Sequence, residues 1–340
     1  MKVLLLAGGN SSERKVSLTS GKAVHDALAQ LGHSVVAVDP ASGQSLLAAD
    51  GSFLGYDSKS DMAPATEATS LSFPQRLDHK DVRDVDVAFI ALHGGTGENG
   101  SIQNLLELAS IKFTGSNMAA CAVSMDKAIT KRLCENESIP TPKWEQFRMP
   151  EGRVPDGLAA GIVERFNLPI IVKPNDSGST VGLTKVEHPD EIQDALKLAL
   201  AESPDILVEQ YIDGREITVA LLDGRTFPVV EIIPKSGLYD YEAKYTEGGS
   251  KYICPAEIPQ SIAEGVQAAA ARLFGVIGCA GLARVDFMLS GDGIFYCLEL
   301  NSVPGMTDLS LVPMAAKADG IDFPQLMQMA LDSALGNRNR

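Results

Sequence analysis

The sequence predicts a protein of mixed α/β and α+β architecture with more than one domain. A strand-helix-strand pattern at the start of the chain indicates an α/β unit, and a strand-turn-strand pattern near its end indicates an antiparallel hairpin. With 340 residues, of which 45% are hydrophobic, the chain is long enough for two or three domains, each with its own core.

The first unit is predicted to contain a parallel sheet. An apolar run at 2–7 leads through a glycine-rich turn into a helical pattern at 16–31, which Gly32 closes, and a second apolar run follows at 34–39. Two strands joined by a helix in this way form a crossover unit, in which the strands are parallel.

The rest of the first unit is less regular. Residues 41–80 are of mixed composition and predict a loop or an insertion. A third strand is expected at 85–92, followed by the glycine-rich HGGTGENG and a helix at 101–110. The pattern changes near residue 117, where we expect the first domain, 1–117, to end.

Two further units are predicted after this point, over residues 118–205 and 206–340. The expected elements of the second are a helix at 118–136, strands at 168–174 and 179–186, and a helix at 190–202. Those of the third are strands at 206–212, 215–222 and 227–233, a polar, tyrosine-rich loop at 239–252, a helix at 260–278 and the final hairpin.

The balance of charge argues against nucleic acid and anionic membranes as main partners. The chain has 44 acidic and 29 basic residues, a formal net charge of -15, which repels polyanions. Its five cysteines are far apart and contain no CxxC pair, so we interpret them as reduced thiols. The first apolar run is too short for a signal peptide, and no later run reaches the length of a membrane span. We therefore expect a cytoplasmic protein.

The hairpin near the end of the chain brings polar side chains together. SGDG between two apolar runs is typical of a hairpin turn, and an even-length loop there places Leu289 opposite Ile294 and Asp286 opposite Cys297. Because side chains alternate between the faces of a strand, this register predicts one shared face for four polar residues. They are Arg284, Asp286, Glu299 and Asn301.

Two carboxylates and an amide on one face are ligands that Mg²⁺ prefers, with substrate phosphates completing its octahedron. The alternative is an ordinary hairpin whose polar face lies in solvent. The loop after the second strand, NSVPGMTDLS, favours the functional interpretation, since small residues there let backbone N–H groups bind a carboxylate or an oxyanion. The pattern indicates phosphate transfer.

The first glycine-rich loop does not match a dinucleotide-binding site, because it lacks the GxGxxG spacing. Glu13 lies in this loop, at the carboxyl end of a predicted parallel strand, where α/β sheets bind ligands. It can hold an ammonium group there, or it is an acidic residue at a helix start. His93 follows another predicted strand and is expected near the same cleft, although a structural capping histidine fits equally.

A second loop has the character of a phosphate cradle. Lys173 precedes the glycine and hydroxyl residues of DSGSTVG, so its charge can neutralise phosphates while backbone N–H groups approach them. Lys127 in SMDK is a second candidate cation, and either lysine alone is more often a solvated surface residue. Glu209, between apolar neighbours, can accept a hydrogen bond from an adenine amine.

Taken together, these motifs resemble the D-alanine-D-alanine ligases, a family of the ATP-grasp superfamily. The resemblance covers nearly the whole chain, and its motifs occur in the expected order. They are GGNSSERKVSLTSG, LHGGTGENGSIQNLLE, SMDK, VKPNDSGSTVG, YDYEAKY, ARVDF and ELNSVPGMTDLSLVP. The resemblance implies a three-domain ATP-grasp architecture.

The resemblance also implies roles for individual residues. Glu13, Ser179 and Tyr245 would form a hydrogen-bonded triad at the first D-alanine, and His93 would lie at the substrate. The nucleotide would be bound by Lys127, Lys173 and Lys244 at its phosphates, Glu209 and Ile212 at its adenine and Glu216 at its ribose. Asp286, Glu299 and Asn301 would bind two Mg²⁺ or Mn²⁺ ions. Arg284 and the backbone of Gly305 would stabilise the oxyanion, and Ser310 and Leu311 would receive the second D-alanine.

The implied reaction joins two D-alanines at the expense of ATP through a D-alanyl phosphate, and supplies peptidoglycan synthesis. A homodimer is expected from the resemblance. Asn99, Thr180 and Ser302 depart from the usual family residues without replacing a ligand. Tyr245 favours peptide formation, and a ligase that takes D-serine or D-lactate as its second substrate is the alternative. A further alternative is a nucleotide-binding protein without catalysis.

Overall fold

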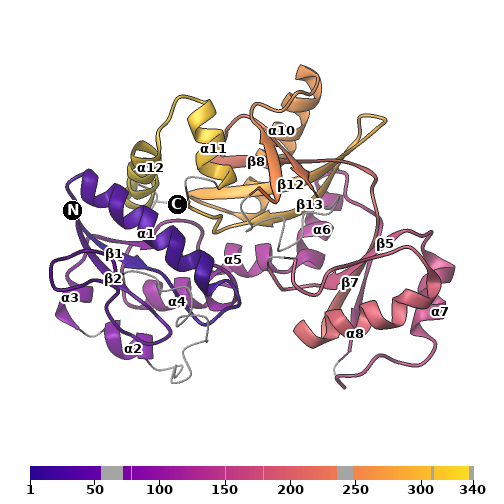
Figure 1. The fold of residues 1–340 in the computed structure, drawn as a ribbon, viewed down its shortest axis with the longest axis horizontal. Helices are drawn as coiled ribbons and strands as arrows, with labels where there is room; N and C mark the ends of the chain where they lie inside the picture. The colour runs from indigo at the N-terminus through magenta and orange to yellow at the C-terminus, as the bar shows by residue number, and fades with distance from the viewer. Residues whose placement is uncertain are drawn as a thin grey trace.

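The computed structural model describes residues 1–54, 72–77, 79–149, 151–178, 180–235, 248–307 and 310–336. Within these ranges the strands form three sheets, of three, four and six strands. Figure 1 shows the N-terminal sheet at one end of the molecule and the four-stranded sheet at the other, with the six-stranded sheet between them.

The N-terminal unit is the predicted parallel α/β domain. Its strands pair in the order β2-β1-β3, all parallel. Their bounds are β1 Lys2–Leu6, β2 Ser34–Val38 and β3 Val87–Ile90. The helices are α1 Arg14–Gln30, α2 Ser72–Leu77, α3 Lys80–Arg83 and α4 Ser101–Leu108, with a 3-10 turn at Gly95–Gly97. The loops that follow β1 and β3 therefore lie side by side at one sheet edge.

The four-stranded sheet is antiparallel, in the order β4-β7-β5-β6. Its strands are β4 Trp144–Arg148, β5 Ile170–Pro174, β6 Thr184–Val186 and β7 Asp205–Gln210. Its helices are α7 Leu158–Arg165 and α8 Ile192–Glu202, with a 3-10 turn at Pro189–Glu191 between β6 and α8. Apolar side chains of α7 and α8 share one core with alternate residues of β5 and β7. The residues between them on these strands lie on the opposite face of the sheet.

The six-stranded sheet has the order β11-β10-β8-β12-β13, with β9 paired to β8. Its strands are β8 Gly214–Leu222, β9 Arg225–Thr226, β10 Val230–Pro234, β11 Ser250–Ile253, β12 Leu282–Ser290 and β13 Phe295–Asn301. The accompanying helices are α5 Met118–Met125, α6 Lys127–Asn136, α10 Gln260–Ile277, α11 Leu311–Ala318 and α12 Phe323–Gly336. The helices α5, α6 and α10 share one apolar cluster with β8, β12 and β13, while α11 and α12 share another with α1 and the N-terminal sheet.

Three predictions about these elements were wrong. The strand expected at 179–186 begins only at Thr184. The strand predicted to open the third unit is β7, which pairs with β4 and β5 and so belongs to the four-stranded sheet. The segment 118–136 forms two helices whose apolar residues pack in the core of the six-stranded sheet. The limits of the three units themselves remain a prediction.

The predicted register of the final hairpin was also wrong. Phe287 lies opposite Cys297 and Asp286 lies opposite Glu299, because a β-bulge leaves Leu298 as an extra residue between these two pairs. Without the bulge, alternation would place Glu299 opposite Val285, on the core face. The bulge returns Glu299 to the face of Asp286, so the predicted shared face of the four polar residues is confirmed by a different route.

In the part of the chain that the structure describes, none of the helices combines the length and the apolar character that a membrane crossing requires.

Candidate active site

A pocket lies between the open face of the four-stranded sheet and the strands β8, β12 and β13. Polar residues occupy one part of its wall, and they include Lys127, Lys173, Glu209, Glu216, Asp286 and Glu299. Apolar side chains form another part, and they include Ile171, Val181, Leu183, Ile212, Met288 and Leu298. Apolar side chains next to cations and carboxylates suit a ligand that has a planar ring and phosphates.

Lys173 and Glu209 come together because β5 and β7 pair antiparallel. Ile171 lies opposite Glu209, and Lys173 is two residues further along the same face of β5. The Lys173 ammonium donates to Glu209 Oε1 over 2.6 Å. A third member, Lys131 of α6, places its Nζ 2.8 Å from Glu209 Oε2. The structure thus brings two cations to one carboxylate on the pocket wall.

Charge interactions outweigh burial at Glu209. Burial alone would raise the pKa of this carboxyl, but the charges of Lys131 and Lys173 lower its pKa to about 2. Burial lowers the pKa of Lys131, and the attraction of Glu209 offsets this only in part. Burial would also lower the pKa of Lys173, but Glu209 and Glu299 raise it. Glu209 is therefore ionised at neutral pH.

Lys127 lies at the first turn of α6, where the helix meets the loop after β5. Its ammonium donates to the carbonyl of Ser177 over 2.7 Å and lies 3.4 Å from Glu299 Oε2. The loop is held in place by Asn175, whose side-chain oxygen accepts from the Ala128 N–H and whose backbone carbonyl accepts from the Lys127 N–H. Lys127 and Lys173 thus reach the same pocket from two elements.

The hairpin contains the three oxygen donors that were predicted to bind Mg²⁺. Asp286 is buried and accepts from Thr218 Oγ1 at 2.6 Å and from Arg284 Nε at 2.9 Å through Oδ1, while Oδ2 accepts from Arg284 Nη2 at 2.8 Å. Asn301 Oδ1 accepts from the Val303 N–H over 3.0 Å. No cluster of three His, Cys, Asp or Glu side chains suited to a metal occurs among the described residues. Two carboxylates and an amide oxygen on one face nevertheless fit Mg²⁺, which needs few protein ligands when phosphates supply the rest.

Arg284 lies beside this donor set, as predicted, and its guanidinium forms a bidentate pair with Asp286. The pairing fixes the positive charge of Arg284 beside the Asp286 carboxylate. A guanidinium fixed in this way is oriented before substrate arrives.

A second pocket adjoins the first and shares Ser177, Gly178 and Val181 with it. Glu13, which is 6% exposed, lies in its wall with residues of the loop after β3. Two glycines pack closely against this carboxylate: a Cβ on Gly94 would come within 2.5 Å of Glu13 Oε2, and one on Gly178 within 2.7 Å. Gly94 also has a φ of +67°, which favours glycine. The loops after β1, β3 and β5 therefore meet at Glu13.

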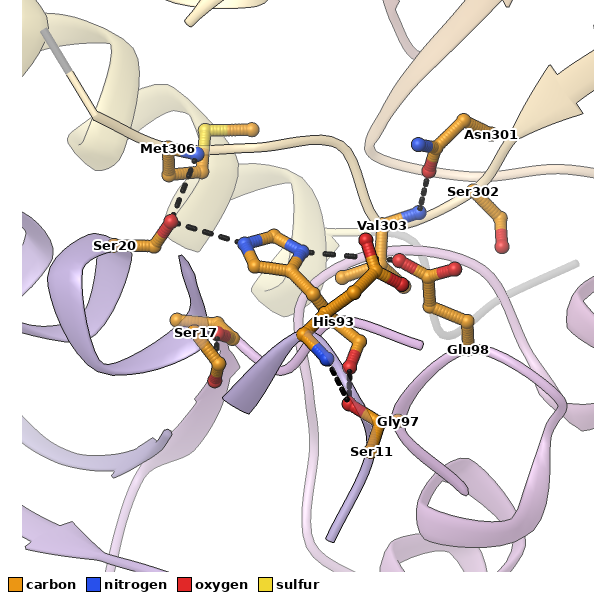
Figure 2. Close-up of polar contacts among 12 residues, drawn as sticks. Ser11, Ser17, Ser20, His93, Gly97, Glu98, Asn301, Ser302, Val303 and Met306 are labelled. Carbon is orange, nitrogen blue, oxygen red and sulfur yellow. Dashed lines mark hydrogen bonds and ion pairs between the residues drawn. The ribbon is translucent and has the colours of Figure 1, made fainter. Parts of the chain in front are cut away.

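His93 joins the N-terminal unit to the loop after β13 (Figure 2). Its Nε2 lies 2.9 Å from Ser20 Oγ, its Nδ1 lies 3.7 Å from Glu98 Oε1, and its carbonyl accepts from Ser11 Oγ. Ser20 Oγ also accepts from the Met306 N–H over 3.3 Å. Because Ser20 Oγ accepts from the Met306 N–H, the Ser20 proton is available for donation to His93 Nε2 in the tautomer that carries its proton on Nδ1. His93 thus helps to position the segment that contains Gly305.

The predicted oxyanion and carboxylate residues lie on this segment. Ser310 is the residue before α11, and its hydroxyl accepts from the Thr307 N–H over 3.0 Å. Leu311, the first residue of α11, is buried. Gly305 lies close to Ser310, since a Cβ on Gly305 would be 2.9 Å from Ser310 Oγ. Backbone N–H groups at this helix start are suited to a carboxylate.

Three predicted site residues lie outside the described residues: Ser179, Lys244 and Tyr245. Most of the tyrosine-rich loop predicted at 239–252 also lies there.

Three residues that contact the predicted site residues were not predicted from the sequence. Lys131 is four residues after Lys127, a spacing that places both on one helix face and was the available signal. Thr218 lies two residues after Glu216 on one strand, so strand alternation places both on the same face, and this was the available signal. Ser20 carried no signal, because its partners come from elements far away in the chain.

Comparison with known proteins agrees with this geometry. The family model for the D-ala D-ala ligase N-terminus matches residues 2–116, and that for the D-ala D-ala ligase C-terminus matches residues 133–332. A D-alanine--D-alanine ligase of Syntrophotalea carbinolica is 39% identical over 336 residues, which cover 98% of this chain and 96% of that protein. One of Gloeobacter violaceus is 40% identical over 336 residues, covering 98% of this chain and 100% of that protein.

Solved structures are similar over the same extent. The D-alanine--D-alanine ligase of Bacillus anthracis, solved in complex with ATP, aligns with a TM-score of 0.77 at 29% identity. A second structure of the same ligase aligns with a TM-score of 0.78. The alignment covers 98% of this chain and 97% of that ligase. The VanG D-Ala:D-Ser ligase of Enterococcus faecalis aligns with a TM-score of 0.76 at 26% identity, covering 98% and 99%.

The sheets and the pocket between them define an ATP-grasp protein. Within this class, the chain belongs to the D-alanine-D-alanine ligase family, since the two family models together match most of its length.

Proposed function

We propose that this protein joins two D-alanines to D-alanyl-D-alanine and cleaves ATP to ADP and phosphate in the process. The names of its relatives state that those proteins are D-alanine--D-alanine ligases. The observation that supports this most strongly is the contact between two pockets. One pocket suits a nucleotide and the other contains the buried Glu13 carboxylate, and they share the loop residues Ser177 and Gly178. A phosphoryl group bound at this junction lies within reach of a small acid in the second pocket.

In the nucleotide pocket, the apolar wall would hold the adenine, with Glu209 accepting from its amine and Ile212 offering backbone groups. Glu216 would bind the ribose. Lys127 and Lys173 would bind the phosphates, and Lys244 is proposed to join them. Their charges neutralise a transferring phosphoryl group, which is the main requirement of this chemistry.

Asp286, Glu299 and Asn301 would hold Mg²⁺, for which their oxygen donors fit. When bound, the metal neutralises charge on the phosphates and orients them for in-line transfer.

The first D-alanine would be held through its ammonium group by Glu13, within the proposed triad with Ser179 and Tyr245. Its carboxylate attacks the γ-phosphorus, the bond to the ADP oxygen breaks, and an acyl phosphate forms. The amine of the second D-alanine then attacks the acyl carbon, loses a proton, and phosphate leaves. Arg284 and the N–H of Gly305 would stabilise the negative oxygen of this tetrahedral step.

Ser310 and Leu311, at the start of α11, would bind the carboxylate of the second D-alanine. His93 would lie at the substrate and maintain this segment through Ser20. An acyl phosphate hydrolyses in water, so closure over the site is required. The same proposal includes a homodimer, a cytoplasmic location and a role in peptidoglycan precursor synthesis. It also includes the division of the chain into the units 1–117, 118–205 and 206–340.

A ligase with D-serine as second substrate is the alternative, and the structural similarity to the VanG D-Ala:D-Ser ligase is the observation that keeps it in view. Tyr245, which favours D-alanine, lies outside the described residues.

Phosphate release from Mg²⁺-ATP tests the proposal. We expect turnover with D-alanine alone and a product with the mass of the dipeptide. Turnover only after addition of D-serine or D-lactate would replace the proposal with the alternative. No turnover with any of these substrates would leave a nucleotide-binding protein without catalysis.

A further inference from the structure

Lys131 is a completely buried lysine that the proposed reaction does not use. Its relative exposure is 0%, and its ammonium lies 2.8 Å from Glu209 Oε2 and donates to Thr141 Oγ1 over 2.8 Å. Thr141 in turn donates to the carbonyl of Cys297 on β13. Lys131 is therefore fixed between α6, β7 and β13, behind the pocket wall that Lys173 and Glu209 form.

Two ammonium groups share a single buried carboxylate here. Lys173 contacts Glu209 Oε1 and Lys131 approaches Oε2, so each oxygen faces one cation. If Glu209 had only Lys173, the two would form a closed ion pair, and an anionic ligand could recruit Lys173 only by leaving a buried carboxylate without a counter-charge, which is costly. A second cation removes this conflict.

Glu209 can also accept a further hydrogen bond. Its Oε2 is buried and makes no well-directed hydrogen bond within the described residues, although Lys131 Nζ is near it. A buried acceptor that lacks such a bond gains when a donor reaches the carboxylate. Since Glu209 lies on the pocket wall next to apolar side chains, the donor that fits is an amino group on a planar ring.

We propose that Lys131 is a positioning residue of the nucleotide pocket, which keeps Glu209 ionised and oriented toward the exocyclic amine of an adenine base when Lys173 turns to the phosphates. The inference rests on the proposed nucleotide-binding function. It assigns to Lys131 a part in base selection without contact to the base.

The test compares the binding of two nucleotides by calorimetry in the presence of Mg²⁺. One is ATP, and the other is purine riboside triphosphate, which has the same phosphates and ring system but lacks the exocyclic amine. A hydrogen bond to a charged acceptor is worth about ten-fold to hundred-fold in affinity, so we expect the wild-type protein to prefer ATP by about that ratio.

The Lys131→Met variant keeps the length of the side chain and removes its charge. We expect its preference for ATP over purine riboside triphosphate to fall by about ten-fold. The affinity for purine riboside triphosphate should also fall, because its phosphates recruit Lys173 and leave Glu209 without a counter-charge. Arg132→Met is the matched control, because it removes one positive charge from the next position of the same helix, where the side chain is exposed. This control should retain the wild-type ratio.

If the role of Lys131 were purely structural, Lys131→Met would lower the affinities for both nucleotides by the same factor. The ratio of the two affinities would then stay unchanged, and that result would overturn the inference. If Lys131→Met does not fold, Lys131→Gln carries the test, since it keeps an N–H donor but not the charge. A wild-type protein that binds both nucleotides equally would also refute the inference while leaving ligase turnover to be judged separately by phosphate release. Binding of neither would refute both the nucleotide pocket and the inference.

Discussion

Asp286 lies directly opposite Glu299 in the β12–β13 pairing, and Leu298 is the bulged residue beside them. The bulge turns two consecutive residues of β13, Leu298 and Glu299, toward the pocket that Asp286 also lines. A regular strand alternates its faces and cannot do this. One irregularity thus supplies both an apolar side chain and a carboxylate to the pocket wall.

Removal of either opposed carboxylate should abolish metal-dependent turnover. We expect Asp286→Asn and Glu299→Gln each to lower the rate of phosphate release by about 100-fold or more, and to raise the Mg²⁺ concentration for half-maximal rate. A Mg²⁺ titration of initial rates measures both effects. Asp292→Asn, in the exposed turn of the same hairpin, is the control, and an unchanged Mg²⁺ requirement in the two site variants would contradict the assignment.

The bulged Leu298 should affect nucleotide affinity rather than chemistry. Truncation by Leu298→Ala removes apolar surface from the pocket, so we expect the KM for ATP to rise about ten-fold while the KM for D-alanine stays near that of the wild type. Steady-state kinetics with each substrate varied in turn provides the measurement. Ile294→Ala removes a similar side chain from the exposed end of the hairpin and should leave both constants unchanged; an equal rise for both substrates would argue against the adenine slot.

The hydroxyl of Ser20 should matter for kcat. Ser20→Ala removes the group that connects His93 Nε2 with the Met306 N–H, so the segment with Gly305 loses a constraint. We expect kcat to fall about ten-fold, with the KM for ATP little changed, because a neutral hydrogen bond contributes about 1 kcal/mol and misplacement adds to this.

Thr19→Ala is the control for Ser20, since Thr19 is exposed on the same helix and its hydroxyl donates only within that helix in the contacts described. If the kcat of Ser20→Ala matches that of Thr19→Ala, the connection through His93 has no catalytic importance.

Glu209 should make folding stability depend on acid. Its pKa is lowered to about 2, from 4.5, so the folded state holds fewer protons at this site than the unfolded state below about pH 5. The stabilisation is complete above the unfolded pKa and is lost as pH falls toward the folded value. The shift corresponds to about 3 kcal/mol.

Denaturant unfolding of wild type and Glu209→Gln between pH 7 and pH 3 measures this effect. The difference between their free energies of unfolding should shrink as the pH falls, since Gln cannot titrate. A difference that stays constant over this range would show that the two lysines do not lower the pKa of Glu209 in the folded protein.

Much of the fold could be predicted because it depends on local patterns. Apolar runs and helix periodicity indicated the parallel N-terminal unit, which the structure confirms. The hairpin turn indicated β12 and β13. Lys173 from one predicted motif and Asp286 and Glu299 from the hairpin line one pocket.

The sequence alone determined which residue types stand at the ends and on the faces of the strands, since those depend on positions along one segment. The tertiary structure alone decided which segments meet. The pairing of β7 with β4 and β5, the bulge at Leu298, the approach of Lys131 to Glu209 and the bond from Ser20 to His93 all join parts of the chain that no local pattern relates. Register and burial follow from the packing of whole sheets and helices, in which a one-residue shift changes the face of every side chain.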